Sequence, residues 1–449
     1  MRGAVQIPAA IAGRRVWLRV GTLIDGSGSA GSGSAGSGSA GSGSAGSSSA
    51  PLRDAHVVYS KAGILYAGTD TPPAELVKNG QTATVPDAEL PDYTLLPGLI
   101  DAHTHIFLEG GELDLDKRAA FLKQSPEELL ELARGRLEKI VGIGVTAMRD
   151  CGDKDGVGLA LSRLCSSPDR PLMPYIDSPG AAIHRRGRYG RFMAEPLESF
   201  PTAAACVAAR VKAGADRIKL IPTGIINFKQ GAVTTAPQMT TEEIGAIVAA
   251  AKSHNRQTIA HGSGDYGIER AIEGGIDSIE HGFFLRDDQL ARMRDRQVAW
   301  APTFSPVQKQ VDHADRFGWD AHVVANLRKI LDRHAASLVK AQAMGVAIVA
   351  ASDAGSCGVA HGLGFLEELE LMEWAGLAPA AIIHSATGAS AKRLAFKEKF
   401  GEIKPGYLSR FILTRHSPLK TVANLRKEKI IVFDDQVFAA GESPDVSGL

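Results

Sequence analysis

The stretch that decides the fold is Leu96-Pro97-Gly98-Leu99-Ile100-Asp101-Ala102-His103-Thr104-His105. It starts as a short apolar run, which predicts a buried strand, and it ends with two histidines two positions apart. Side chains two positions apart on a strand point to the same side, so His103 and His105 should leave the strand end together. Two imidazoles on one face form half of a metal site. Alone, such a pair is weak evidence, because it also occurs in surface histidines that bind no metal.

Downstream of this strand, short apolar runs alternate with helical stretches over about 300 residues, which predicts an α/β fold built as a (β/α)₈ TIM barrel. The first helix has a clear start, with Ser125 as N-cap, Pro126 at the first helical position and Glu128 completing a capping box. The predicted strands are 98–100, 145–149, 217–221, 258–260, 277–280, 298–302 and 346–351, and the predicted helices are 126–141, 201–213, 241–253 and 267–273.

Both chain ends have β character instead. Turn residues separate short strand-like runs before residue 95, and strand-like runs return after residue 399. We therefore predict a small β-sandwich domain formed from both termini, beside the barrel. The predicted boundaries are 1–95 for the N-terminal part of the β domain, 96–398 for the barrel and 399–449 for the C-terminal part, and the predicted strands are 16–20, 56–59, 64–67, 409–413 and 430–433.

A repetitive segment interrupts the N-terminal part at residues 26–50, where GSGSA occurs four times and GSSSA follows. Glycine and serine cannot bury enough apolar area to offset chain entropy, so this insertion is predicted to be a flexible, linker-like loop. Loop closure becomes only slowly more costly with length, so a hairpin tip tolerates it. It is interpreted as an inert surface loop, with altered access to the active site as the alternative.

The composition excludes several classes of function. The chain of 449 residues has 50 basic and 50 acidic residues, so no net charge directs it to nucleic acid or to an anionic membrane. No apolar run reaches the ~18 residues of a membrane span. The four cysteines form no CxxC pair and are interpreted as reduced thiols of a cytoplasmic enzyme. A small-molecule substrate is therefore expected, and a homo-oligomer stays possible.

Four further residues of metal-ligand type end predicted strands. Lys219 lies in Gly-Ala-Asp-Arg-Ile-Lys-Leu, Asp353 ends an apolar run, and His261 and His281 are twenty residues apart, which fits one strand–helix unit. Each has an ordinary structural explanation, such as a salt-bridged lysine or a turn aspartate. Together with His103 and His105, however, they would all face the rim of the barrel at the carboxyl ends of its strands, where active sites form.

At this point a resemblance becomes plain. The chain resembles the amidohydrolase superfamily, in its imidazolonepropionase-like and prolidase-like branch, over nearly its whole length. The motifs that carry the resemblance are GTLIDG, LLPGLIDAHTH, GVTAMRDCG, GADRIKL, SIEHGFF, PTFS, SDAG and FGEIKPG.

The resemblance implies a cofactor of two divalent metal ions. Nitrogen and oxygen ligands suit Zn²⁺ best, with Mn²⁺ or Co²⁺ as alternatives. Lys219 would be N6-carboxylated and bridge both ions. The implied ligands are His103, His105 and Asp353 for the more buried ion, and His261 and His281 for the more exposed ion.

The implied reaction is hydrolysis of an amide bond in a dipeptide or N-acyl amino acid, in the manner of a dipeptidase or carboxypeptidase. A metal-bridging hydroxide would attack, because metal binding lowers the pKa of water to about 7. Asp353 would shuttle the proton to the leaving nitrogen, and Lys219 would also be catalytic. A lactone, carbamate or ester hydrolase is the alternative. A deaminase is disfavoured, because members of that class usually lack the lysine. A metal-free scaffold is disfavoured because no ligand is missing.

Substrate contacts are harder to infer. His184, with Arg185 beside it, falls where relatives carry a Gly-Gly-His segment, and the pair could bind a substrate carboxylate. A solvated basic loop is an equal alternative, because the flanking glycines are missing here. His361 lies in a loop just past Asp353 and is a further candidate contact.

Asp101 stands two residues before His103 and has two open interpretations. It could orient a metal ligand from behind, or it could be a structural aspartate in a turn.

Overall fold

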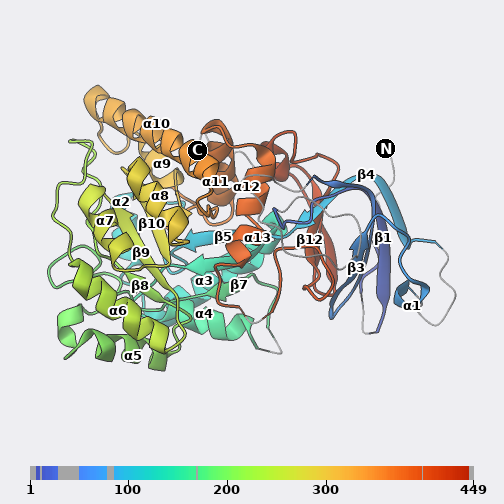
Figure 1. Cartoon of the computed structure of the whole chain (residues 1–449), viewed down its shortest axis with the longest axis horizontal. Coiled ribbons are helices and arrows are strands. Elements are labelled where there is room, and N and C mark those ends of the chain that lie inside the picture. Colours follow the sequence, from blue (N-terminus) through green and yellow to red (C-terminus); the bar gives the residue numbers. More distant parts are fainter. Residues whose placement is uncertain are drawn as a thin grey trace.

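The computed structural model describes residues 7–10, 13–28, 50–77, 85–167, 170–396 and 398–443. It shows a strand-rich unit built from both chain ends, beside a larger unit in which helices surround central strands (Figure 1). Most of the predicted insertion at 26–50 lies outside the described residues. Within the described residues, no helix is both long and apolar enough to cross a bilayer.

The chain ends form one sheet of seven strands, in the order β14-β13-β12-β4-β1-β2-β3. The antiparallel pairing of β4 with β12 joins the N-terminal strands to the C-terminal strands. These strands form one continuously hydrogen-bonded sheet, so the predicted β-sandwich is not confirmed. The bounds are β1 Arg15–Leu23, β2 Leu52–Ser60, β3 Gly63–Gly68, β4 Ala88–Pro97, β12 Arg410–Thr414, β13 Lys429–Phe433 and β14 Gln436–Ala440.

Alternating apolar residues give this sheet its own core. Val16, Leu18 and Val20 on β1 are buried together with Tyr59 and Phe411, whose rings meet edge to face with centroids 5.1 Å apart. Each buried apolar side chain contributes about 1.5–3 kcal/mol relative to exposure. The two chain ends are therefore held together by a shared core as well as by backbone hydrogen bonds.

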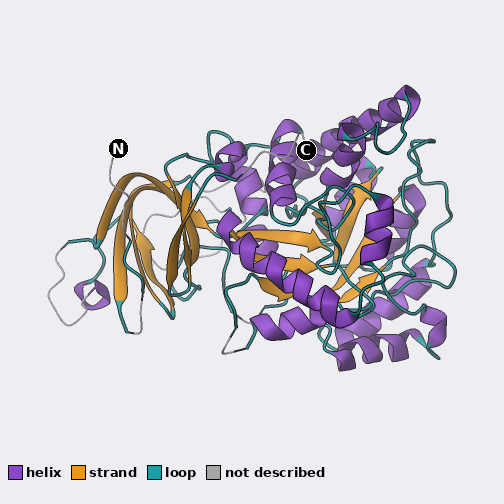
Figure 2. Cartoon of the chain, turned by 180° about the vertical axis from the view of Figure 1, so that it is seen from behind, coloured by secondary structure: helices purple, strands orange, loops and turns teal. Residues whose placement is uncertain are grey.

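The larger unit is a TIM-barrel-like α/β fold. Parallel strands form two arcs, one of three strands in the order β5-β6-β7 and one of four in the order β11-β10-β9-β8. Figure 2 shows these strands in the middle of the unit with helices around them. The bounds are β5 Leu99–Thr104, β6 Val145–Asp150, β7 Tyr175–Asp177, β8 Ile218–Leu220, β9 Thr258–Ser263, β10 Ser278–Phe283 and β11 Ala299–Ala301.

Isolated bridges extend the four-stranded arc on both sides, to residues outside both arcs. Ile183 bridges to Leu220 on one side, and Trp300 bridges to Ile348 on the other. The predicted strand 346–351 is not a regular strand, although Ala350 accepts a hydrogen bond from Ala102 at 2.9 Å. Within the described residues, the sheet therefore does not close as a continuous eight-stranded ladder.

All four predicted helices are present: α6 has the predicted bounds, α3 ends one residue early, and the starts of α5 and α7 differ from the prediction by two residues. The capping box of Ser125 and Glu128 begins α3, as predicted. The long helix α10 was not predicted. The bounds are α1 Ala74–Val77, α2 Leu115–Phe121, α3 Pro126–Ile140, α4 Val157–Cys165, α5 Ala203–Ala213, α6 Thr241–Ser253, α7 Asp265–Glu273, α8 Asp287–Asp295, α9 Ser305–Asp312, α10 Ala321–Met344, α11 Leu363–Trp374, α12 Pro379–Ser385 and α13 Gly388–Ala391.

A buried ion pair ties neighbouring barrel strands together. Arg217, just before β8, donates to both carboxylate oxygens of Asp177 at the end of β7, and both side chains are at most 1% exposed. Asp177 also accepts from the backbone N–H of Ala395 at 2.7 Å. This pair links β7 to β8, for which no strand pairing is recorded among the described residues.

We predict that Asp177→Ala lowers the free energy of unfolding by about 3–5 kcal/mol, because it leaves the Arg217 guanidinium buried without a counter-charge. Urea denaturation measures the change. The matched control is Glu138→Ala, which breaks the exposed pair with Arg134 and should cost less than about 1 kcal/mol. Equal losses in the two variants would contradict the prediction.

Candidate metal centre

Four imidazoles gather at the carboxyl ends of the barrel strands. His103 is in β5 and His105 directly follows it, while His261 is in β9 and His281 is in β10. The ring centroids are 5.4 Å apart for His103 and His105, 4.9 Å for His103 and His281, and 4.6 Å for His261 and His281. The structure thus brings together the four histidines that were predicted as metal ligands.

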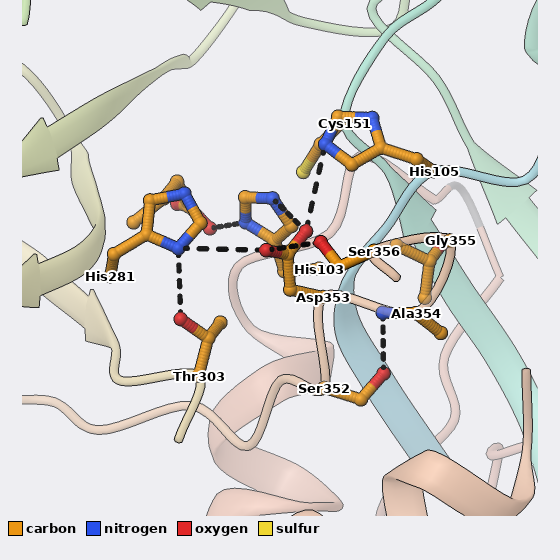
Figure 3. Close-up of polar contacts among 12 residues, drawn as sticks. His103, His105, Cys151, His281, Thr303, Ser352, Asp353, Ala354, Gly355 and Ser356 are labelled. Atoms are coloured by element: carbon orange, nitrogen blue, oxygen red, sulfur yellow. Dashed lines mark hydrogen bonds and ion pairs between the residues drawn. The ribbon is translucent and has the colours of Figure 1, made fainter. Parts of the chain in front are cut away.

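Asp353 lies among these rings. Its Oδ1 is 3.5 Å from Nε2 of His103 and 3.6 Å from Nε2 of His105, and its Oδ2 is 3.9 Å from Nδ1 of His281. Figure 3 shows His103, His105 and His281 facing this carboxylate. Ligand atoms of His103, His105 and Asp353 all lie within 4.8 Å of one another. That arrangement can hold a metal ion.

Lys219 completes the group from β8. Its side chain is only 2% exposed and lines the same cavity as His105, His261 and Asp353. Within the described part of the chain, no hydrogen bond or ion pair is recorded for its Nζ. A buried ammonium without a partner is costly, so this lysine needs an explanation beyond packing.

Each histidine is oriented by one ring nitrogen, which leaves the other available as a ligand. Nδ1 of His103 is 2.6 Å from Oε2 of Glu280, and Nδ1 of His105 is 3.3 Å from the carbonyl of Gly152. Contacts of this kind set the tautomer and the ring orientation of metal-binding histidines. In the other two, Nε2 of His261 is 3.2 Å from the carbonyl of Gly224 and Nδ1 of His281 is 2.8 Å from Oγ1 of Thr303.

The protonation of these groups also fits a cation. Burial, reinforced by the Lys219 charge, lowers the pKa of His105 and of His261 to about 3. Burial likewise holds the pKa of His103 and of His281 well below the usual value. The imidazoles are therefore neutral, which is the form that binds metals.

Two buried polar atoms at the centre of the cluster show whether the residues present fit a metal ion. Nε2 of His103 and Oδ1 of Asp353 are fully buried and have no hydrogen-bond partner. Leaving a buried polar atom unpaired costs about 1–3 kcal/mol, and here both atoms face each other at 3.5 Å. A divalent cation bound by nitrogen and oxygen would satisfy both, so the residues fit the implied metal.

Backbone strain concentrates at the same place. His281, Thr303 and Asp353 have φ angles of 68°, 52° and 56°, in the left-handed region that non-glycine residues rarely adopt. Such strain costs about 1–3 kcal/mol per residue and persists where the surroundings enforce it, often at functional sites. Two of the three residues are predicted metal ligands, and the third contacts one.

A cavity of about 470 Å³ opens from this cluster. Its size falls in the range of about 300–1,000 Å³ that small-molecule sites occupy. Apart from the metal-binding group its wall is mainly apolar, with Phe192, Ile221, Phe228, Phe283 and Val307 among its side chains.

The comparisons with known proteins identify the family. The sequence model of a protein family, described as the amidohydrolase family, matches residues 94–441 of the chain. The chain belongs to the amidohydrolase family. Together with the ligand cluster, this makes it a metal-dependent hydrolase.

Several known proteins resemble the chain in sequence or structure. Ochratoxinase of Aspergillus niger is 25% identical over 405 residues, which cover 85% of this chain and 81% of the relative. An uncharacterized protein of Mycobacterium tuberculosis is 28% identical over 298 residues, covering 66% of this chain and 72% of the relative. Among solved structures, an Xaa-Pro dipeptidase with bound methionine has a TM-score of 0.73 at 25% identity and covers 94% of this chain and 99% of its own.

Sequence reasoning missed one part of this amidohydrolase site, a buried acid–base pair behind His103. Glu280 contacts Nδ1 of His103 and forms an ion pair with Arg149 at 2.7 Å, and both side chains are fully buried. Arg149 also donates to the carbonyl of Ala102. The signals in the sequence were Arg149 within the motif GVTAMRDCG and Glu280 directly before His281. Strand alternation would place Glu280 and His281 on opposite sides, so it gave no reason to assign both to one site.

Asp101 lies two residues before the predicted ligand His103. Its Oδ1 accepts from the backbone N–H of Ser352 at 3.0 Å, and its Oδ2 accepts from the Ser352 hydroxyl. The contact joins β5 to the segment that carries Asp353. Its recorded hydrogen bonds reach Ser352 and the backbone N–H of His103 but no ligand side chain, so both interpretations of Asp101 stay open.

The three predicted substrate contacts do not line the cavity. Both ring nitrogens of His184 contact carbonyl oxygens, at 2.8 and 3.0 Å. Arg185 pairs with Glu198 at 3.2 Å and with Glu243. His361 is buried, with its Nε2 3.2 Å from the backbone carbonyl of His105. Local hydrogen bonds and ion pairs engage His184 and Arg185, whereas Nδ1 of His361 is buried without a hydrogen-bond partner. The substrate role of these three residues stays a prediction.

We predict that Glu280→Gln weakens metal binding about 10- to 100-fold, because an amide holds the His103 ring less strongly than a carboxylate. Titration with Zn²⁺ against a competing chelator measures the affinity. The control is Glu367→Gln, which alters a buried carboxylate that pairs with Lys309 at 3.0 Å instead of a histidine. An unchanged affinity in Glu280→Gln, or an equal loss in both variants, would contradict this role.

Proposed function

We propose that this amidohydrolase uses two divalent metal ions to cleave the amide bond of a small substrate, such as a dipeptide or an N-acyl amino acid. The observation that carries the proposal is the convergence of four neutral imidazoles, one unpaired carboxylate oxygen and one buried lysine at the mouth of the barrel.

The proposed ligands divide between two ions, with Zn²⁺ preferred because all donors are nitrogen or oxygen. When bound, the metals would polarise the scissile carbonyl and make water nucleophilic near neutral pH. His103, His105 and Asp353 would hold one ion, His261 and His281 the other, and Lys219 would bridge both.

Carboxylation of Lys219 would explain its burial. The neutral Nζ would form a bond to the carbon of CO₂ and release one proton to water, which gives a carbamate with a negative charge. This converts a costly buried cation into an anion beside metal ions, where it is stabilised. The four surrounding imidazoles cannot supply that stabilisation, because they are neutral in the folded protein.

Asp353 would carry the proton from the attacking water to the leaving nitrogen. Its Oδ1 faces the histidines, whereas its Oδ2 accepts a hydrogen bond from the Ser356 hydroxyl at 3.0 Å. Burial raises the pKa of this carboxyl to about 7 before any cation binds. With Oδ1 directed at the histidines, the carboxylate could take a proton from the attacking water on Oδ2 and return it to the leaving nitrogen.

The choice of an amide substrate rests on relatives as well as on the site. The structural relative at 25% identity is named an Xaa-Pro dipeptidase, and the A. niger relative is named an ochratoxinase. The apolar wall of the cavity suits a substrate with a large hydrophobic side chain.

We predict that the zinc-loaded enzyme hydrolyses members of an N-acyl amino acid and dipeptide library, and that chelation abolishes this activity. Ochratoxin, after which the A. niger relative is named, belongs in the same screen. Release of free amine measures turnover. Turnover of lactones or aminopurines without any turnover of amides would overturn the proposed substrate class.

We predict that Lys219→Ala loses both metal content and activity, because no anion bridges the ions, and that short carboxylates restore part of the activity. With ¹³C-bicarbonate, the carbamate signal should appear in the wild type and vanish in this variant. Lys429→Ala is the matched control, since Lys429 is also a buried lysine but lies in β13 of the terminal sheet. Full activity of Lys219→Ala would exclude the bridging carbamate.

A further inference from the structure

Among the described residues that line the cavity, three are of the charged types Arg, Lys, Asp and Glu: Arg118, Lys219 and Asp353. The last two belong to the proposed metal centre. If Lys219 is carboxylated, Arg118 becomes the one permanent cation that the described residues contribute to the wall.

Arg118 is held in place by hydrogen bonds to backbone carbonyl oxygens, which do not neutralise its positive charge. It lies in α2, and its Nη2 donates to the carbonyl of Gly355 at 2.7 Å. Its Nη1 donates to the carbonyls of Glu109 and Glu112. All three acceptors are backbone oxygens, and the described residues provide no carboxylate that forms an ion pair with this guanidinium.

The guanidinium also has donors left over. An arginine carries five N–H groups, and three hydrogen bonds are recorded here, so two groups remain, including the one on Nε. Other arginines near the site differ. Arg149 pairs with Glu280, and Arg185 pairs with Glu198 and Glu243. Arg118 is thus in position to accept a carboxylate from outside the protein.

The anchor of Arg118 places it beside the reacting groups. Gly355 comes two residues after Asp353 in the chain, and its φ of 102° requires glycine. A side chain at Gly355 would also collide with the carbonyl of His105, because a Cβ would lie 2.5 Å from that oxygen. The loop that Arg118 holds therefore directly follows one proposed ligand, Asp353, and packs against another, His105.

We propose that Arg118 binds the free carboxylate of the substrate, so that the cavity selects amides formed on the amino group of an apolar amino acid. The inference rests on the proposed function and names the part of the substrate that the metal centre does not contact. The wall side chains Phe192, Ile221, Phe228, Phe283 and Val307 would receive the apolar side chain. Arg118 takes the role that the sequence assigned to Arg185.

The test compares two probes that differ only in the carboxylate, N-acetyl-L-phenylalanine and N-acetyl-2-phenylethylamine. In the zinc-loaded enzyme, Arg118→Gln should lower kcat/KM for the acid about 10- to 100-fold, mainly through KM, because a charge-assisted hydrogen bond is lost. The neutral probe should change less than about threefold. Arg118→Lys should lie in between, since it keeps the charge but loses the fork geometry.

The matched control is Arg136→Gln. Arg136 also anchors a rim loop, through a 2.7 Å hydrogen bond from Nη2 to the carbonyl of Ile106, but it does not line the cavity. This variant should alter turnover of both probes by the same factor. Equal losses for both probes in Arg118→Gln would show that Arg118 only braces the loop, and would overturn the proposal.

A binding measurement separates this proposal from the proposed function. Calorimetry with the zinc-loaded protein should show that Arg118→Gln weakens binding of the acid about 10- to 100-fold and leaves binding of the neutral probe unchanged. That result would uphold the role of Arg118 even if neither probe were hydrolysed. Equal affinity of the wild type and of Arg118→Gln for the acid would overturn it.

Discussion

The central constraint on this structure is the free-energy cost of burying side chains that could bind a metal but have no hydrogen-bond partner in the protein. At the mouth of the barrel, Nε2 of His103 and Oδ1 of Asp353 face each other without hydrogen bonds, and Lys219 lies buried beside them. A folded protein accepts such unpaired groups when a bound species satisfies them. Divalent cations bridged by a carbamate would satisfy all three groups at once, which is why the metal centre explains more than any ordinary structural role does.

The rest of the fold holds these groups in place. Strand ends bring histidines from β5, β9 and β10 together, and left-handed backbone angles at His281 and Asp353 turn their side chains toward one centre. Behind them, Glu280 and Arg149 form a fully buried pair that orients His103. The strain and the buried charges are costs, and a site that must keep its ligands pre-organised is where such costs persist.

Local chemistry explains what the sequence could predict. The spacing of His103 and His105, and the strand–helix interval between His261 and His281, follow from regular geometry, so the gathering of these ligands was predictable. Glu280 was missed because the positive φ angle at His281 breaks the alternation of side chains along the strand, and the sequence pattern does not reveal that angle. Contacts of the cavity depend on loops distant in sequence. Arg118 is 237 residues from the Gly355 carbonyl that it holds, and regular periodicity carries no information on such pairs.

The most direct test of the central claim is anomalous X-ray scattering from crystals of the zinc-loaded protein, measured on both sides of the zinc absorption edge. The account predicts two zinc peaks, one among His103, His105 and Asp353 and one beside His261 and His281, with density continuous from the Lys219 Nζ between them. A fully active crystal with no zinc peak, or with zinc bound away from these side chains, would contradict it.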